Sequence, residues 1–498
     1  MSKPSARINN LHRDVNLFSR LYIASQTRDS DMDDFFAHEN HPWPPSLASN
    51  GIMHSSKKSD LMDCLESMSP TVDSEPKVDV IIIDGAALLH NFDPKKSQTN
   101  APVNTFADYS EQVFIPYIEK RLRNVYRIDI IWDVYIEKCL KSQTRKNRAS
   151  GAPIRVELDT KIPTSWRDFL RNDSNKVSLS KLLAEAVQYH QFSPSKVVVS
   201  TLKDKAVSSP IIDLSQLSCS HEEADTRLLF HVKHLFDKGF RTFMIQATDT
   251  DVVVISVAMC SILPDCEIWV VFGHGKRLRY MPCHTFNSIL GTNAPWDLLF
   301  FHAFTGCDTV SSFYGIGKKT AWNLLKTMPD MFTLFAKLST TPDTISSDQM
   351  QQLERYVVLL YQRTSTLSSV NSARKHMFTQ NRKMDNIPPS YAALEQHVRR
   401  AAYQAGHIWG QSLVADPVVP PPEQWGWKRV GDSSSSSNSE NQALSPCWTI
   451  LPEAASACLE LIKCRCKVGC TGRCSCVKAN LMCESTDLCL CMGQCLRE

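Results

Sequence analysis

Seven acidic residues end or follow apolar stretches at widely separated points of this 498-residue chain. They are Asp84, Asp133, Glu223, Asp225, Asp249, Asp251 and Asp308. Carboxylates that a fold brings together cost free energy unless cations neutralise them. Their oxygens are hard ligands of the kind that Mg²⁺ prefers, and no His or Cys belongs to the pattern. The set therefore predicts a site for divalent cations.

Each of these motifs taken alone has a simpler explanation. Glu223 and Asp225 could favour a helix N-terminus through its dipole, and Asp84 could cap a turn between a strand and a helix. Gly315-Ile-Gly317 is more often an ordinary tight turn than a phosphate cradle. It is not a P-loop, because Ser312 stands where that motif needs glycine. The metal-site prediction therefore rests on the ordered set.

A second group of candidate ligands lies near the C-terminus and consists of nine closely spaced cysteines. They are Cys464, Cys466, Cys470, Cys474, Cys476, Cys483, Cys489, Cys491 and Cys495. Three Cys-x-Cys pairs place thiolates too tightly for an ordinary disulfide scaffold, and we expect no secretory signal from the polar residues 1–14. Thiolates favour zinc, which we expect to supply most of the folding free energy of so small a module.

The elements that position the acids are apolar strands alternating with helices. Strands are expected at Val78–Asp84, Tyr126–Trp132, Phe240–Ala247 and Glu267–Phe272, with a helix over Val252–Leu263. This alternation predicts an α/β fold with a parallel sheet covered by helices. Ligands bind at the carboxyl edge of such sheets.

The local backbone decides where neighbouring acids point. Asp249 and Asp251 are predicted to share one face of extended backbone, because i and i+2 side chains do so. Glu223 and Asp225 open a helix that begins near His221, so one of them should precede its first turn or act through water. Asp308 comes ahead of the Gly315 turn, within a helical region that runs from Asp297 to Met328.

Composition divides the chain into five segments. We expect a polar, partly disordered extension (1–76), the α/β domain (77–335), a helical extension (336–412), a Pro/Ser-rich linker (413–446) and the zinc module (447–498). A formal charge of +3 means that any affinity for nucleic acid must come from local patches. The longest nearly apolar run, residues 252–263, is too short to cross a bilayer, so we expect a soluble intracellular protein without a membrane partner.

Taken together, the acidic motifs resemble flap endonuclease and XPG-type nucleases over about residues 78–330. The matching series is Ile-Ile-Ile-Asp84-Gly, Ile-Trp-Asp133, Glu223-Ala-Asp225, Thr-Asp249-Thr-Asp251 and Gly-Cys-Asp308, followed by Gly315-Ile-Gly317-Lys-Lys-Thr-Ala. The resemblance implies a PIN-like domain that cleaves branched DNA with two Mg²⁺ ions bound by the seven acids. It also implies a helix-two-turn-helix that grips duplex backbone.

Further roles follow from the same resemblance. Lys141 and Arg145 would clamp the scissile phosphate, while Gly315, Gly317, Lys318 and Lys319 would contact the phosphates of the duplex. A solvated basic loop is the alternative for residues 138–148. The chain also departs from the family pattern, because about 76 unrelated residues precede Val78. Cys307 and Thr309 replace the usual neighbours of Asp308, and residues 134–220 lack an obvious helical arch.

The cysteine cluster, including Lys463-Cys-Arg-Cys-Lys and Gly472-Arg-Cys-Ser-Cys, resembles the tesmin-like CXC domain. That resemblance implies three zinc ions held by nine cysteines. Many members of the family bind DNA, and protein docking is the alternative role. The pairing of these two domains looks like that of transposon-associated or domesticated proteins.

The expected function is therefore metal-dependent cleavage of structured DNA in the nucleus, with RNA as an alternative substrate. One rival is a catalytically inactive relict of the nuclease fold that binds DNA or acts as a scaffold. Another follows from Asp249-Thr-Asp251-Val-Val-Val, which resembles the nucleophile motif of haloacid-dehalogenase phosphatases. In that case Asp249 would be phosphorylated, but the earlier strands that end in Asp84 and Asp133 would go unexplained.

Overall fold

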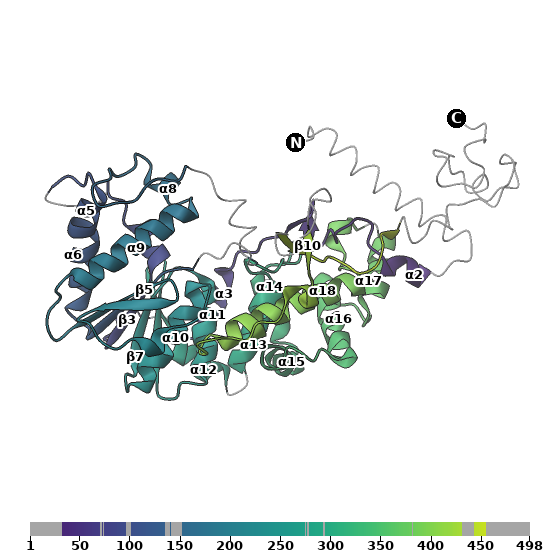
Figure 1. Ribbon diagram of the computed structural model, residues 1–498. Coiled ribbons are helices and arrows are strands. Elements are labelled where there is room, and N and C mark those ends of the chain that lie inside the picture. The colour runs from purple at the N-terminus through teal and green to yellow at the C-terminus, as the bar shows by residue number, and fades with distance from the viewer. Residues whose placement is uncertain are drawn as a thin grey trace, which may run out of the picture.

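The computed structural model describes most of the chain between residues 32 and 454 (Figure 1). The described ranges are 32–69, 72, 74–95, 101–134, 140, 152–273, 275, 278–291, 294–380, 382–430 and 443–454. The predicted phosphate clamp, Lys141 and Arg145, and the nine predicted zinc ligands lie outside these ranges.

A seven-stranded sheet in the order β6-β5-β4-β3-β7-β8-β9 forms the centre of the α/β part. Its strands are β3 (Val80–Asp84), β4 (Arg127–Ile131), β5 (Val197–Leu202), β6 (Lys205–Ser209), β7 (Thr242–Gln246), β8 (Glu267–Phe272) and β9 (Arg279–Pro282). The pairings from β5 to β8 are parallel, and the two edge strands are antiparallel. The predicted α/β class is therefore confirmed, and the four predicted strands are present.

The central strand β3 separates two hydrophobic cores. Val80 and Ile82 belong to one core, and Ile81 and Ile83 belong to the other. This division follows from the two-residue period of a strand, and β-branched residues suit a strand that is buried on both faces. An apolar run that ends in Asp84 thus fixes both the centre of the sheet and one of its carboxyl ends.

Helices cover both faces of the sheet. One core contains residues of α10 (Ala224–Asp237), α11 (Thr250–Met259) and α12 (Cys283–Leu290). The other core contains residues of α4 (Gly85–Asn91), α5 (Phe106–Tyr109), the π-helical turn η1 (Ser110–Phe114), α6 (Ile115–Leu122), α8 (Trp166–Phe169) and α9 (Asp173–Tyr189). A short 3-10 turn, η2 (Ser215–Leu217), precedes α10.

A helical part lies beside the sheet (Figure 1). It consists of α13 (Ala294–Phe304), α14 (Lys318–Leu325), α15 (Pro329–Thr340), α16 (Ser347–Tyr361), α17 (Val370–Thr379), η4 (Met384–Asn386), α18 (Tyr391–Ala402), η5 (Tyr403–Ile408) and η6 (Trp409–Gln411). Leu353 and Val398 share one hydrophobic core with Val80 and Ile82 of the sheet. The core therefore continues across the boundary that we expected near residue 336. Among the described residues, no helix is long and apolar enough to cross a membrane.

Two segments that looked irregular in sequence are part of this fold. The first contains α2 (Met32–Ala37), β1 (Ala48–Ser49), β2 (Ile52–Met53) and α3 (Asp60–Glu66), and it buries Phe35, Phe36 and Leu61. The second, expected to be a linker, contains η7 (Pro422–Trp425), β10 (Trp427–Val430) and β11 (Ala443–Pro446), and Trp425 and Trp427 are buried. A few large apolar side chains anchor each otherwise polar segment, which average composition did not reveal.

Candidate functional site

Three of the predicted acids lie where the strand order of the sheet reverses. From β3 the chain proceeds outward to β4 and β5, and it then returns to form β7 on the other side of β3. Asp84 is the last residue of β3, while Asp133 and Asp249 follow β4 and β7. Open α/β sheets bind ligands at the carboxyl ends of strands at such a switch point.

Asp84 is held in place by the start of α4. Its Oδ1 accepts hydrogen bonds from the amides of Ala86 at 2.9 Å and Ala87 at 3.3 Å. A Cβ on Gly85 would lie 2.1 Å from Cε3 of Trp132, so this tight turn requires glycine. Burial, followed by the negative charge of Asp133, raises the pKa of Asp84 to about 7.

Asp133 connects the end of β4 to the start of α10. Its Oδ1 accepts from the amide of Ala224 at 3.0 Å, and the amide of Val134 donates to the carbonyl of Glu222 at 3.0 Å. Glu223 is the N-cap of α10 and Asp225 lies in its first turn. The prediction that one acid of this pair precedes the first turn is therefore confirmed.

Asp225, Asp249 and Asp251 form the tightest acidic group. Each offers one carboxylate oxygen, and these oxygens all lie within 4.8 Å of one another. Oxygens this close, from three separate carboxylates, could hold a metal ion.

The backbone that brings Asp249 and Asp251 together differs from our prediction. Asp249 is the N-cap of α11 and has extended backbone, but Asp251 lies in the first helical turn, so the two do not share one extended stretch. Oδ1 of Asp249 accepts from the amide of Asp251 at 3.0 Å. Aspartate favours this capping role, which begins the helix two residues earlier than predicted.

Asp251 is buried, and both of its carboxylate oxygens are hydrogen-bonded. Oδ1 accepts from Nε2 of His302 at 2.8 Å, and Oδ2 accepts from Nζ of Lys58 at 3.0 Å. Burial holds the pKa of His302 well below its ordinary value, so its imidazole is neutral and donates through Nε2. These two partners fix the orientation of the carboxylate.

Lys58 is the main feature of the site that the sequence did not reveal. Its Nζ lies 3.4 Å from Asp249 Oδ1, 3.0 Å from Asp251 Oδ2 and 3.0 Å from Asp308 Oδ1. Burial lowers the pKa of Lys58, but the charges of Asp251, Asp249 and Asp308 more than offset burial and raise it overall. The side chain is therefore a fixed ammonium ion. Its surroundings, His-Ser-Ser-Lys-Lys-Ser-Asp over residues 54–60, carry no motif that pointed to it.

His302 was also missed, although a weak signal was present. It is a lone histidine within the apolar helical run from Leu298 to Phe304. A buried histidine among apolar residues must find a hydrogen-bond partner, and here the partner is Asp251.

The ionised form of Asp249 stays destabilised even though the Lys58 ammonium lies beside it. Burial and then the charge of Asp251 raise the pKa of Asp249, although Lys58 acts in the opposite direction. Asp249 in turn contributes to the raised pKa of Asp84. A further cation beside these carboxylates would relieve both effects.

The two basic residues predicted to contact DNA after Gly317 differ in exposure. Lys318 is fully buried, and its Nζ donates to the carbonyl of His302 at 2.8 Å and to Oγ1 of Thr305 at 2.9 Å. This corrects the prediction that Lys318 contacts phosphates, because its face of α14 packs against α13. Burial lowers the pKa of Lys318 to about 7. Lys319 is exposed and pairs with Asp63 at 2.7 Å.

The glycines of the same turn are exposed. Gly315 has a φ of +68°, which favours glycine, and Gly317 is the N-cap of α14. A side chain at either position would meet nothing within 4 Å. Both residues therefore lie on open surface, as contact with a phosphate backbone would require.

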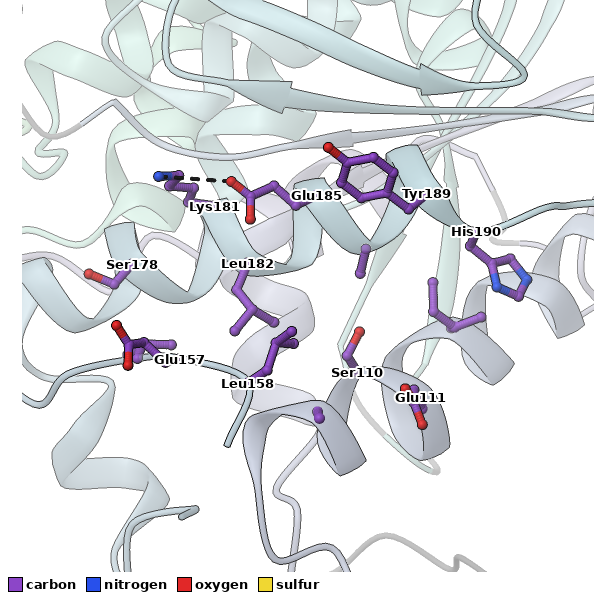
Figure 2. Close-up of a pocket in the computed structure, with 14 residues that line it drawn as sticks. Ser110, Glu111, Glu157, Leu158, Ser178, Lys181, Leu182, Glu185, Tyr189 and His190 are labelled. Atoms are coloured by element: carbon purple, nitrogen blue, oxygen red, sulfur yellow. Dashed lines mark ion pairs between the residues drawn. The ribbon is translucent and has the colours of Figure 1, made fainter. Parts of the chain in front are cut away.

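Two cavities lie near the sheet. The larger, about 710 Å³, is a groove between α9 and η1 that Leu158 and Tyr189 help to line (Figure 2). Among the described residues that line it, none is one of the seven acids. A cavity of about 310 Å³ is lined by Glu223, Thr309, Tyr403 and Gln404, so it adjoins the acidic site.

A comparison of this chain with protein-family models gives no match, and a comparison with curated proteins gives none either. The residues of the site are therefore the basis for inferring its chemistry.

Proposed function

We propose that this protein is a metal-dependent nuclease that hydrolyses phosphodiester bonds in structured DNA. The observation that carries the proposal is the group of oxygens from Asp225, Asp249 and Asp251, which lie within 4.8 Å of one another. Its position at the carboxyl edge of a parallel sheet, beside Asp84, adds support, because such edges are ligand sites.

The ligand chemistry favours Mg²⁺ or a similarly hard cation. Cations bound among these acids would polarise a phosphate oxygen and lower the pKa of a bound water. Asp225, Asp249 and Asp251 would hold a cation, and the hydrogen bond from His302 fixes the orientation of the Asp251 carboxylate. The resemblance to flap endonuclease and XPG-type nucleases implies two such ions shared by all seven acids.

The proposed reaction is a simple hydrolysis. A bond forms between the water oxygen and phosphorus, and the bond between phosphorus and the leaving oxygen breaks. One proton of the water ends on the leaving hydroxyl, and the other stays on the new phosphate monoester until solvent removes it. No oxidant, reductant or further co-reactant is needed.

Substrate binding would draw on several parts of the chain. The exposed glycine turn at Gly315 and Gly317, together with Lys319, would contact the backbone of a duplex. Lys141 and Arg145 would clamp the phosphate that is cut. The cysteine module with three zinc ions would add affinity for DNA, and residence in the nucleus would follow from that substrate.

The rival proposal is an inactive relict of a nuclease that binds DNA or serves as a scaffold. Its specific support is Lys58, which already places a positive charge against Asp249, Asp251 and Asp308. A site that had lost its metals could be stabilised in this way.

Cleavage assays separate these proposals. The purified full chain is incubated with labelled flap, bubble and hairpin DNA, and with matched RNA, in Mg²⁺ or in EDTA. We expect cleavage only with Mg²⁺ and none with Asp249→Ala. Cleavage that survives Asp249→Ala would identify a contaminant, and binding without cleavage would support the relict. A phosphate trapped covalently on Asp249 would instead revive the phosphatase.

A further inference from the structure

Lys58 lies at the meeting point of acids from two separate segments. Asp249 and Asp251 come from the start of α11, and Asp308 comes from the loop between α13 and α14. All three have an oxygen within 3.4 Å of the Lys58 ammonium. A single side chain from the N-terminal part of the chain thus contacts three of the seven predicted metal ligands.

The backbone around Lys58 is fastened to the loop that carries Asp308. Ser56 Oγ donates to the carbonyl of Gly306 at 2.9 Å, and the amide of Ser312 donates to the carbonyl of His54 at 2.9 Å. A Cβ on Gly306 would lie 2.9 Å from Ser56 Oγ, so the two segments are closely packed. The fold therefore places Lys58 in the site.

The next element along the chain is also anchored. Within α3, Asp63 pairs with Lys319 at 2.7 Å and Glu66 pairs with Arg279 at 2.6 Å. These contacts join α3 to α14 and to β9. The Lys58 side chain is only 17% exposed, so its ammonium has little freedom to leave the carboxylates.

The Lys58 ammonium and a divalent cation would compete for the same carboxylate oxygens. Mg²⁺ and Mn²⁺ need carboxylate oxygens at about 2.1 Å and repel a nearby positive charge. Oδ2 of Asp251 already accepts from Lys58, and Oδ1 accepts from His302. Asp225 contributes an oxygen close to those of Asp249 and Asp251, and Asp84 lies at the adjacent strand end.

We propose that Lys58 is a built-in cation of the acidic site, and that its ammonium holds one of two cation positions. The folded protein then binds one divalent cation beside the ammonium, among Asp225, Asp249 and Asp251. This inference rests on the proposed cation site and deepens it, because it replaces one of the two expected metal ions with a side chain. A fixed charge cannot be removed by chelators, so the response to metal concentration has a Hill coefficient of one.

Metal counting on the full-length protein tests this inference. Mn²⁺ is the probe, and its binding is measured by calorimetry and by the electron paramagnetic resonance signal of the free ion. Lys58→Met removes the charge and keeps most of the aliphatic stem, while Lys58→Arg keeps the charge. Lys57→Met is the matched control, because Lys57 is an exposed neighbour that pairs with Asp60 at 2.8 Å.

We expect one Mn²⁺ in the wild type, lost in Asp249→Asn, and two in Lys58→Met. Lys57→Met and Lys58→Arg should each bind one. Two Mn²⁺ ions in the wild type would overturn the inference, even if Lys58→Met fails to fold. It is also overturned if Lys58→Met binds one ion with an affinity within twofold of wild type, or if the single ion survives Asp249→Asn.

The nuclease proposal fails by a different result. One Mn²⁺ in the wild type without cleavage of any substrate would reject the nuclease and leave the role of Lys58 intact. Two Mn²⁺ ions in the wild type, together with cleavage, would support the nuclease and reject the proposed role of Lys58. If neither the wild type nor any variant binds Mn²⁺, both proposals are overturned.

Discussion

Asp129, within the sheet, and Asp249, just beyond it, have opposite electrostatic character. Within β4, Asp129 accepts from Arg127 Nε at 2.6 Å, from Arg127 Nη2 at 3.0 Å and from His231 Nδ1 at 2.7 Å. Burial alone would raise the pKa of Asp129, but Arg127 and His231 hold it well below its ordinary value. Beyond β7, the pKa of Asp249 is raised even though Lys58 is beside it.

The difference shows what separates a structural ion pair from a site. The side chains of Asp129 and Arg127 are 0% and 4% exposed, and the guanidinium engages both carboxylate oxygens. The side chains of Asp249 and Lys58 are 34% and 17% exposed, and the single Lys58 ammonium is shared among three carboxylates. The first group is closed to ligands, whereas the second is reachable from solvent and gains from a further cation.

The largest effect is expected for Asp249→Asn. Cleavage in Mg²⁺ should fall about 10³-fold, because a cation ligand worth several kcal/mol in the transition state is lost. The amide oxygen can still cap α11, so the thermal unfolding temperature should stay at or above that of wild type. Single-turnover cleavage and calorimetry measure the two quantities. A variant that unfolds would show that Asp249 is structural, like Asp129.

Asp129→Asn should have the opposite pattern. Removing one partner of a buried ion pair leaves the Arg127 charge uncompensated and should lower the free energy of unfolding by about 3–5 kcal/mol. Urea denaturation measures this loss, and Mn²⁺ binding should be unchanged. The double variant Arg127→Met with Asp129→Leu should lose less, because no charge is left unpaired. Loss of Mn²⁺ binding in Asp129→Asn would contradict the view that Asp129 has a structural role separate from the cation site.

Lys318 provides a test of pH dependence. Its pKa falls from 10.5 to about 7 on folding because of burial, so the unfolded chain binds more protons between these values. The free energy of unfolding should therefore rise with pH from 7 to 10.5, by on the order of 2–4 kcal/mol. Lys318→Met should lack this rise, which urea denaturation across the pH range would reveal. Equal slopes in both proteins would show that Lys318 is charged when buried.

The smallest effect is expected for Lys319→Ala. Lys319 is exposed, and its pair with Asp63 lies on the surface, so thermal stability should not change measurably. Affinity for duplex DNA should weaken a few-fold, and the slope of log affinity against log salt should drop by about one. Fluorescence anisotropy at several salt concentrations measures both. An unchanged slope would remove Lys319 from the DNA-binding surface.

Local sequence was sufficient for the strands that carry the acids. β-branched residues from Val80 to Ile83 followed by Asp84 encode a buried strand and its end without reference to distant residues. The prediction was wrong for the backbone between Asp249 and Asp251, because helix capping competed with strand extension. The side-chain alternation of a strand was assumed for a segment in which Asp249 caps a helix.

Long-range packing explains what could not be predicted. Lys58 reaches Asp249 and Asp308 only because residues 54–56 are bound to the Gly306 loop, far along the chain. The burial of Lys318 likewise depends on how α14 packs against α13, which periodicity in α14 does not specify. The zinc module and the phosphate clamp stay predictions, since their residues lie outside the described part of the chain.

The two ends of the described chain are joined, and this has a consequence for biosynthesis. His38 Nδ1 contacts the carbonyl of Pro452 at 2.9 Å across 414 positions, and the amide of Ala454 donates to the carbonyl of Glu39 at 2.7 Å. Contacts between such distant residues form slowly and only after nearly all of the chain has left the ribosome. Phe35 and Phe36 are likewise made long before α17, which packs against them in the folded protein. Their burial is therefore completed only late in synthesis.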